Sequence, residues 1–193
     1  MQIGVASTTA DAVVRHGDAS FTVTGSSSET LVGKKVAGIT DGILVKVSKS
    51  LKITSVVRSS VAKGKRIWNS ASGSLLLAGQ VIVGNNIQTA VTKFSSTYVP
   101  TWTARFTSTG YALVNSSNQL FFQSMVPIPQ LAWNAMTPTP LLLTFDSKGV
   151  ITAAHSAPPG QVELMSLVDS KELGVLALIW SAESASIFTP ITR

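Results

Sequence analysis

Apolar and polar residues alternate in short segments along most of the chain, and this pattern predicts β-strands. Successive side chains of a strand point to opposite faces, so alternation marks a strand with one buried face. A longer unbroken apolar run, as in 74–83, is typical of a strand buried on both faces. The predicted strands are 19–24, 43–47, 51–57, 61–68, 74–83, 87–94, 98–106, 111–114, 119–126, 141–145, 150–154, 162–168 and 173–180, with 31–39 as a further candidate.

Turn-forming residues separate these segments. The clearest turn is 146–149, Asp-Ser-Lys-Gly, which joins two β-rich runs and predicts a hairpin whose glycine is left-handed. The segment 115–118, Asn-Ser-Ser-Asn, predicts a second hairpin, and Pro100 marks an edge strand or a bulge. One short helix is expected at 130–136.

These elements predict an all-β protein, an antiparallel β-sandwich or barrel with at most one or two short helices. No self-similarity with a period of about 20–50 residues is visible, which disfavours a repeat architecture. The length of 193 residues suits one domain. The expected divisions are an amino-terminal arm at 1–18, the β-domain at 19–180 and a carboxy-terminal tail at 181–193.

The stretch 34–66 carries nine of the fifteen Lys and Arg residues and one carboxylate, Asp41. These cations alternate with apolar residues of predicted strands, so one sheet surface or rim should carry a positive field that attracts polyanions. Lys46 and Lys52 share one predicted face, whereas Lys49 requires a turn at 48–50 or a sheet edge. Part of the cluster could instead keep edge strands soluble. The candidate nucleic-acid contacts are Lys34, Lys35, Lys46, Lys49, Lys52, Arg58, Lys63, Lys65 and Arg66.

Composition favours a protein that associates with copies of itself. The net charge is +6, yet only 12% of the residues are charged and 45% are apolar. Little charge then opposes association of the surfaces outside the basic stretch. The start of the chain lacks the pattern of a secretion signal, and no apolar run reaches the length of a membrane span. We therefore expect a soluble protein made in the cytoplasm.

No constellation for catalysis or cofactor binding stands out. His16 and His155 are the only histidines, and no nucleophile motif accompanies either of them. The chain has no cysteine, and its nine carboxylates are scattered, with only Asp169 and Glu172 close together in the sequence. An enzyme, a metal site and a cofactor are therefore not expected. Among the aromatic residues, Trp68 follows three cations closely and is the candidate for base stacking.

The style of the sequence resembles the single jelly-roll coat proteins of small non-enveloped icosahedral RNA viruses. The resemblance covers 19–180 and includes short Ser/Thr-rich strands, an early basic segment and a final apolar strand at 173–180. It implies an eight-stranded jelly-roll sandwich, self-assembly into a shell, genome contact from the inner surface, and a location in the virion and the host cytoplasm. Residues 1–33 depart from the family's Arg-rich arm, since their net charge is negative.

The expected function is that of a self-assembling capsid subunit that packages RNA, with no membrane or small-molecule partner. Two alternatives stay open. The first is a phage tail, head or decoration protein that does not bind nucleic acid. The second is a β-sandwich module with a ligand pocket formed by Trp102, Tyr111 and Trp133.

Overall fold

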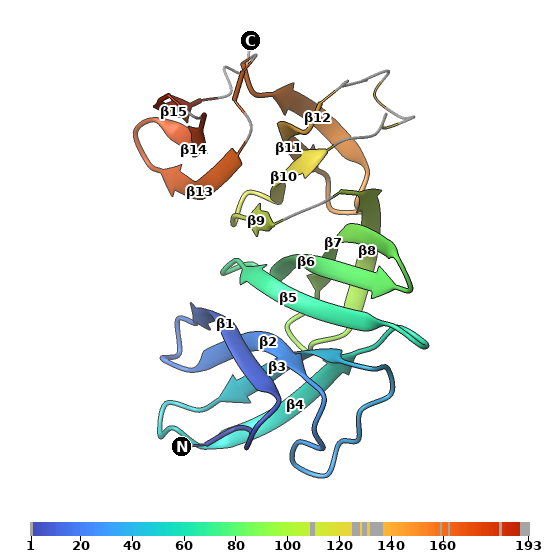
Figure 1. Ribbon diagram of the computed structural model, residues 1–193. Coiled ribbons are helices and arrows are strands. Elements are labelled where there is room, and N and C mark those ends of the chain that lie inside the picture. The colour runs from blue at the N-terminus through green and yellow to red at the C-terminus, as the bar shows by residue number, and fades with distance from the viewer. Residues whose placement is uncertain are drawn as a thin grey trace.

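The computed structural model describes residues 2–108, 111–124, 128, 131, 137–158, 160–161, 163–181 and 183–189. The described residues form fifteen β-strands and no α-helix. The strands make four small antiparallel sheets that follow one another in chain order, arranged as a four-bladed β-propeller (Figure 1). We call these sheets blade 1 to blade 4.

Blades 1 to 3 have four strands each and blade 4 has three. Blade 1 consists of β1 (Thr8–Arg15), β2 (Phe21–Ser27), β3 (Asp41–Val47) and β4 (Ile53–Ser59). Blade 2 consists of β5 (Lys65–Ala71), β6 (Leu76–Val83), β7 (Asn86–Phe94) and β8 (Pro100–Thr107). Blade 3 consists of β9 (Ala112–Val114), β10 (Gln119–Ser124), β11 (Thr139–Phe145) and β12 (Ile151–Ser156). Blade 4 consists of β13 (Glu163–Ser170), β14 (Gly174–Trp180) and β15 (Ala185–Phe188).

The prediction of a jelly-roll β-sandwich is wrong. A jelly roll is built from Greek keys, in which long connections bring strands distant in sequence side by side. Here each blade is an up-and-down meander in which every ladder joins strands consecutive in the chain. The resemblance to jelly-roll coat proteins therefore loses its structural basis, and nothing in the fold supports the assignment to a capsid or a virion.

The local strand predictions agree with the structure more closely than the architecture does. The turn expected near Lys49 is present, since the amide of Leu51 donates to the carbonyl of Ser48. Pro100 begins an edge strand, and the ladder of that strand changes register there. The segment 31–39 is not a strand but part of a loop, and strand β1 lies within the segment interpreted as an arm. The helix expected at 130–136 lies outside the described residues except for Leu131.

Three apolar layers hold successive blades together. Between blades 1 and 2 the layer contains Leu44, Trp68, Leu75, Leu77, Phe94 and Tyr98. Between blades 2 and 3 it contains Leu76, Ala78, Val91, Phe106, Ala112, Val114, Leu120, Phe122, Ile128, Leu141, Leu143 and Phe145. Between blades 3 and 4 it contains Phe121, Leu142, Ala157, Ala177 and Ile179. Substantial contacts among the described strands run only between consecutive blades, so blades 1 and 4 are not joined to each other in the same way.

The turn at Gly149 fixes how blade 3 meets blade 2. Gly149 has a φ of +83°, a left-handed conformation that favours glycine, and the Asp146 carbonyl accepts a hydrogen bond from its amide. A Cβ atom at this position would lie 2.6–2.9 Å from ring atoms of Trp102. That ring packs on Phe145 with centroids 5.1 Å apart. A glycine is therefore required here both for the turn and for the close packing of the Trp102 ring against it.

Gly149→Ala should consequently destabilise the fold more than Gly84→Ala. Gly84 also has a positive φ, of +57°, but a Cβ there would meet nothing within 4 Å. Both substitutions should cost about 1–2 kcal/mol of backbone strain, and overpacking against Trp102 should cost Gly149→Ala about 1–3 kcal/mol more. Urea denaturation of the two variants measures the difference. Equal losses would show that the indole is not held against this turn.

Candidate nucleic-acid interface

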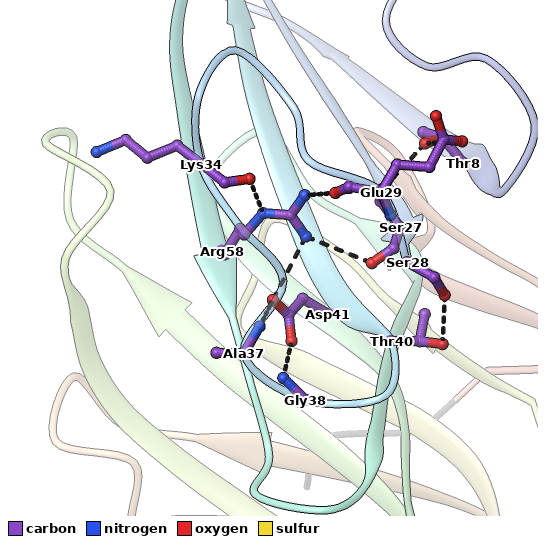
Figure 2. Close-up of polar contacts among 10 residues, drawn as sticks. All are labelled: Thr8, Ser27, Ser28, Glu29, Lys34, Ala37, Gly38, Thr40, Asp41 and Arg58. Carbon is purple, nitrogen blue, oxygen red and sulfur yellow. Dashed lines mark hydrogen bonds and ion pairs between the residues drawn. The ribbon is translucent and has the colours of Figure 1, made fainter.

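The loop between β2 and β3 carries Lys34 and Lys35 and is fixed to blade 1 by the guanidinium of Arg58 (Figure 2). This group makes the one ion pair found among the described residues, with Asp41 at 3.3 Å. It also donates to the backbone carbonyls of Lys34, Ser27 and Glu29. The side chain of Arg58 is 8% exposed and that of Asp41 is fully buried, so the pair lies inside the protein. Arg58 thus ties the loop to strand β4 of blade 1.

Asp41 is the second anchor of this loop. Its carboxylate accepts hydrogen bonds from the amides of Ala37 and Gly38, both at 2.9 Å. Burial by itself would raise the pKa of Asp41, but these amides, the Ser60 hydroxyl and the Arg58 guanidinium together outweigh it and lower the pKa. The carboxylate therefore stays ionised at neutral pH and is fully occupied by internal donors. It is not free to neutralise the exposed lysines.

Glu29 fastens the amino-terminal segment to the same loop. Its carboxylate accepts hydrogen bonds from the amides of Val5, Ala6 and Ser7, and from the Thr8 hydroxyl. The Val5 amide, followed by those of Ser7 and Ala6, lowers the pKa of Glu29 to about 2. The segment 2–8 and the loop are therefore joined by one ionised carboxylate.

Six of the nine predicted contact residues are exposed lysines, and the structure places them with Lys46 at the two ends of blade 1. At one end, Lys34, Lys35 and Lys63 lie on adjacent loops, and Lys65 lies beside them as the first residue of β5; we call these four the Lys34 group. There Thr40 pairs with Lys65, and the Ile39 amide bonds to the Gly64 carbonyl. Lys49 and Lys52 lie in the turn between β3 and β4 at the other end, and half-buried Lys46 precedes that turn, with its ammonium 6.0 Å from the Tyr98 ring. We call Lys46, Lys49 and Lys52 the Lys49 group. Strands of seven residues span roughly 20 Å, so these are two separate patches.

Arg66, by contrast, is an interior residue. It is 4% exposed, lies 4.0 Å above the Trp68 ring and donates to the Thr92 hydroxyl at 2.8 Å. No carboxylate pairs with it among the described residues, and its buried Nε has no hydrogen-bond partner. Burial, and after it repulsion from Arg105, lowers the pKa of Arg66 to about 9, so the side chain remains charged at neutral pH.

The aromatic candidates are not arranged as stacking platforms or as one pocket. Trp68 is fully buried and packs edge-on against Phe94, so its ring is closed to bases. Trp102 packs in the layer between blades 2 and 3, Tyr111 is 53% exposed, and Trp133 lies outside the described residues. Near the Lys49 group, a hollow of about 410 Å³ is lined by Asp18, Ser20, Lys46, Ser48, Lys49 and Thr54.

The rest of the described chain offers no metal centre. No three His, Asp or Glu side chains gather there in a way that could hold a metal ion. Asp169 is instead a structural acceptor, bound by the Asn115 side chain, the Ser116 amide and the Ser117 hydroxyl. Among the described residues, no helix is long and apolar enough to cross a membrane. Comparison of the sequence with models of known families and with curated proteins finds no match.

Arg58→Met and Arg66→Met should have opposite effects on stability. Removing Arg58 leaves buried Asp41 without its counter-charge and takes one donor from each of three carbonyls, which should cost about 3–5 kcal/mol. Removing Arg66 takes away an unpaired buried charge and leaves Thr92 bonded to Thr103, so the free energy of unfolding should stay within about 1 kcal/mol or rise. Chemical denaturation at pH 7 measures both. A larger loss for Arg66→Met would contradict this assignment.

Acid should release the amino-terminal segment as Glu29 is protonated. Because the pKa of Glu29 falls to about 2 in the folded protein from 4.5, its stabilising contribution is fully present above pH 4.5 and is lost as the pH falls through 2. Hydrogen-exchange protection of the Val5, Ala6 and Ser7 amides should follow this titration. Glu29→Gln should lose the same protection at pH 7. The Tyr98 amide, which bonds to the Ser95 carbonyl, is the internal control and should not respond to the substitution.

Proposed function

We propose that the protein is a self-associating structural subunit that binds RNA through the two lysine groups of blade 1. The observation that carries the proposal is that none of the exposed lysines of these groups forms an ion pair within the part of the chain that the structure describes. Asp41 and Glu29, which hold the loop of Lys34 and Lys35, are already engaged by internal donors. Asp18, beside Lys46 and Lys49, accepts hydrogen bonds from the amide and the hydroxyl of Ser20. A polyanion would supply the missing counter-charge and release its own counterions.

The contact would be independent of base sequence. An ammonium group on a flexible stem interacts with phosphate as a point charge, whereas base edges are usually selected by planar, bidentate side chains. The two arginines of the basic stretch, Arg58 and Arg66, are held in the interior by the bonds described above. The proposed interface therefore consists of the Lys34 group and the Lys49 group, and binding should depend steeply on salt.

Self-association is supported by a surface that is poor in charge and rich in exposed apolar residues. Val32, Leu51, Leu173 and Ile187 are each more than 60% exposed. Electron microscopy of the protein expressed with RNA tests this part of the proposal. Regular particles of many copies would support a structural subunit, and single subunits at high concentration would contradict it.

Lys49→Gln with Lys52→Gln should weaken RNA binding and flatten its salt dependence. Each lost phosphate contact with single-stranded RNA reduces the slope of log K against log salt by about 0.7, so the double variant should lose about 1.4. The matched control is Lys148→Gln with Lys171→Gln, which removes the same charge from exposed positions on blades 3 and 4. Filter binding or fluorescence anisotropy from low to moderate salt measures the slopes.

Two outcomes would contradict the RNA assignment. Equal slopes of log K against log salt for the two double variants would mean that the lysines of blade 1 make no specific contribution to phosphate binding. A flat salt response of the unaltered protein, together with retained self-association, would favour a tail, head or decoration component that does not bind nucleic acid.

A further inference from the structure

Blade 4 presents an apolar face to the outside. Residues paired across the strands share a face, and the register places Val168 beside Leu176, Leu178 beside Ile187, and Trp180 across from Glu163. On this face Val168 is 52% exposed, Leu178 36%, Trp180 44% and Ile187 70%. Met165, at a register shift in β13, adds a side chain that is 53% exposed. We call this surface the outer face of blade 4.

The opposite face of the same blade is already used. Leu164, Leu167, Val175, Ala177 and Ile179 pack on Phe121 and Leu142 of blade 3. An antiparallel sheet with one face on the core normally has polar residues on its other face. Blade 4 instead has apolar side chains on both, as the inner blades do. Its outer face therefore has the composition of a packed surface without having a partner among the described residues.

Blade 1, the first of the four blades in chain order, has no uncovered outward sheet face. Its outward side chains, among them Ile43, Val45 and Val47, are buried beneath Leu31 of the loop and Ile3 of the amino-terminal segment. The loop and segment are held in place by Arg58, Asp41 and Glu29. We call the segment 2–8 and the loop 28–40 together the cover of blade 1. Blade 1 could contact blade 4 of the same chain through this face only if the cover moved. The cover itself exposes Val5 (86%), Val32 (68%) and Ile39 (56%).

The charges at the two ends are complementary. Exposed acids lie at both ends of blade 4, Glu163 and Glu183 at one end and Glu172 at the other, and Lys171 is the one exposed base among the described residues of the blade. The cover of blade 1 carries the exposed bases Lys34 and Lys35 beside its apolar residues, and its one acid, Glu29, is engaged. Two copies of blade 4 facing each other would bring like charges together. Blade 4 of one copy facing the cover of another brings unlike charges together.

We infer that the outer face of blade 4 binds the cover of blade 1 on a second copy of this chain. Leu178, Trp180 and Ile187 form the apolar centre of the contact. Glu163 and Glu183, which lie at the same end of blade 4 as Trp180, meet Lys34 and Lys35 at its rim. The contact is head-to-tail, so each subunit keeps one free end and assembly continues into a ring or a filament. The inference rests on the self-association in the proposed function and names the surfaces that produce it.

Charge reversal tests the pairing without touching the buried layers. In the absence of RNA, Glu163→Lys with Glu183→Lys should weaken self-association about tenfold or more, and Lys34→Glu with Lys35→Glu should do the same, because each change opposes like charges. The chain that carries all four substitutions should regain association, and so should an equimolar mixture of the two double variants. Analytical ultracentrifugation over a concentration series measures the association constants.

A second pair of variants tests the apolar centre. Trp180→Ser should weaken association about tenfold or more, since buried tryptophans dominate such contacts. Val150→Ser, at an apolar site in a turn of blade 3 that is 58% exposed, should leave association unchanged. Far-UV circular dichroism and melting curves confirm that both variants fold.

The results that overturn the inference are distinct from those that overturn the proposed function. Weakening by Trp180→Ser with no effect of either charge reversal would indicate a blade 4 to blade 4 contact and refute head-to-tail pairing. Association unaffected by any of these variants would refute the inference but leave a self-associating RNA-binding subunit in place. A protein that stays monomeric at high concentration, with and without RNA, would refute both.

Discussion

The structure depends on one constraint, that a small sheet with apolar residues on both faces must be covered on both. The middle strands of blades 2 and 3 show it most clearly. In β11, Leu141 and Leu143 face blade 2 while Leu142 faces blade 4, and all three are fully buried. In β6, Leu76 faces blade 3 and Leu77 faces blade 1. Neither sheet could be stable with one face open, so each needs a neighbour on both sides.

The two ends of the row meet this constraint differently. Blade 1 covers its outward face with its own chain, and the cover is costly to form because a long loop has to be ordered. An internal ion pair, backbone carbonyls and a carboxylate that binds three amides compensate for that cost. Blade 4 has no described segment of this kind on its outer face. The same physical requirement is thus met in blade 1 by a loop held with polar contacts, whereas in blade 4 it leaves an exposed apolar surface.

Local features of the fold could be predicted from the sequence because their causes are local. The turn at Gly149, the edge strand at Pro100 and the apolar run of β6 each follow from a few neighbouring residues. The architecture could not be predicted in the same way, because alternation gives two faces to a strand without saying what each face will meet. The absence of a sequence repeat also pointed away from a propeller. Blades can nevertheless share a meander without sharing residues, since each one packs against a different neighbour.

The basic stretch shows how much a charge pattern can say about a site. Composition identified the segment, but it could not separate cations that build the fold from cations that face solvent. Arg58 and Arg66 resemble the neighbouring lysines in the sequence, yet each uses a planar guanidinium with several donors to occupy an interior position. Lysines lack that geometry and are strongly hydrated, so they remain at the ends of the strands. Arg58 holds the loop and Arg66 is enclosed beside Trp68, and the exposed lysines are thereby left as the charge that a partner can reach.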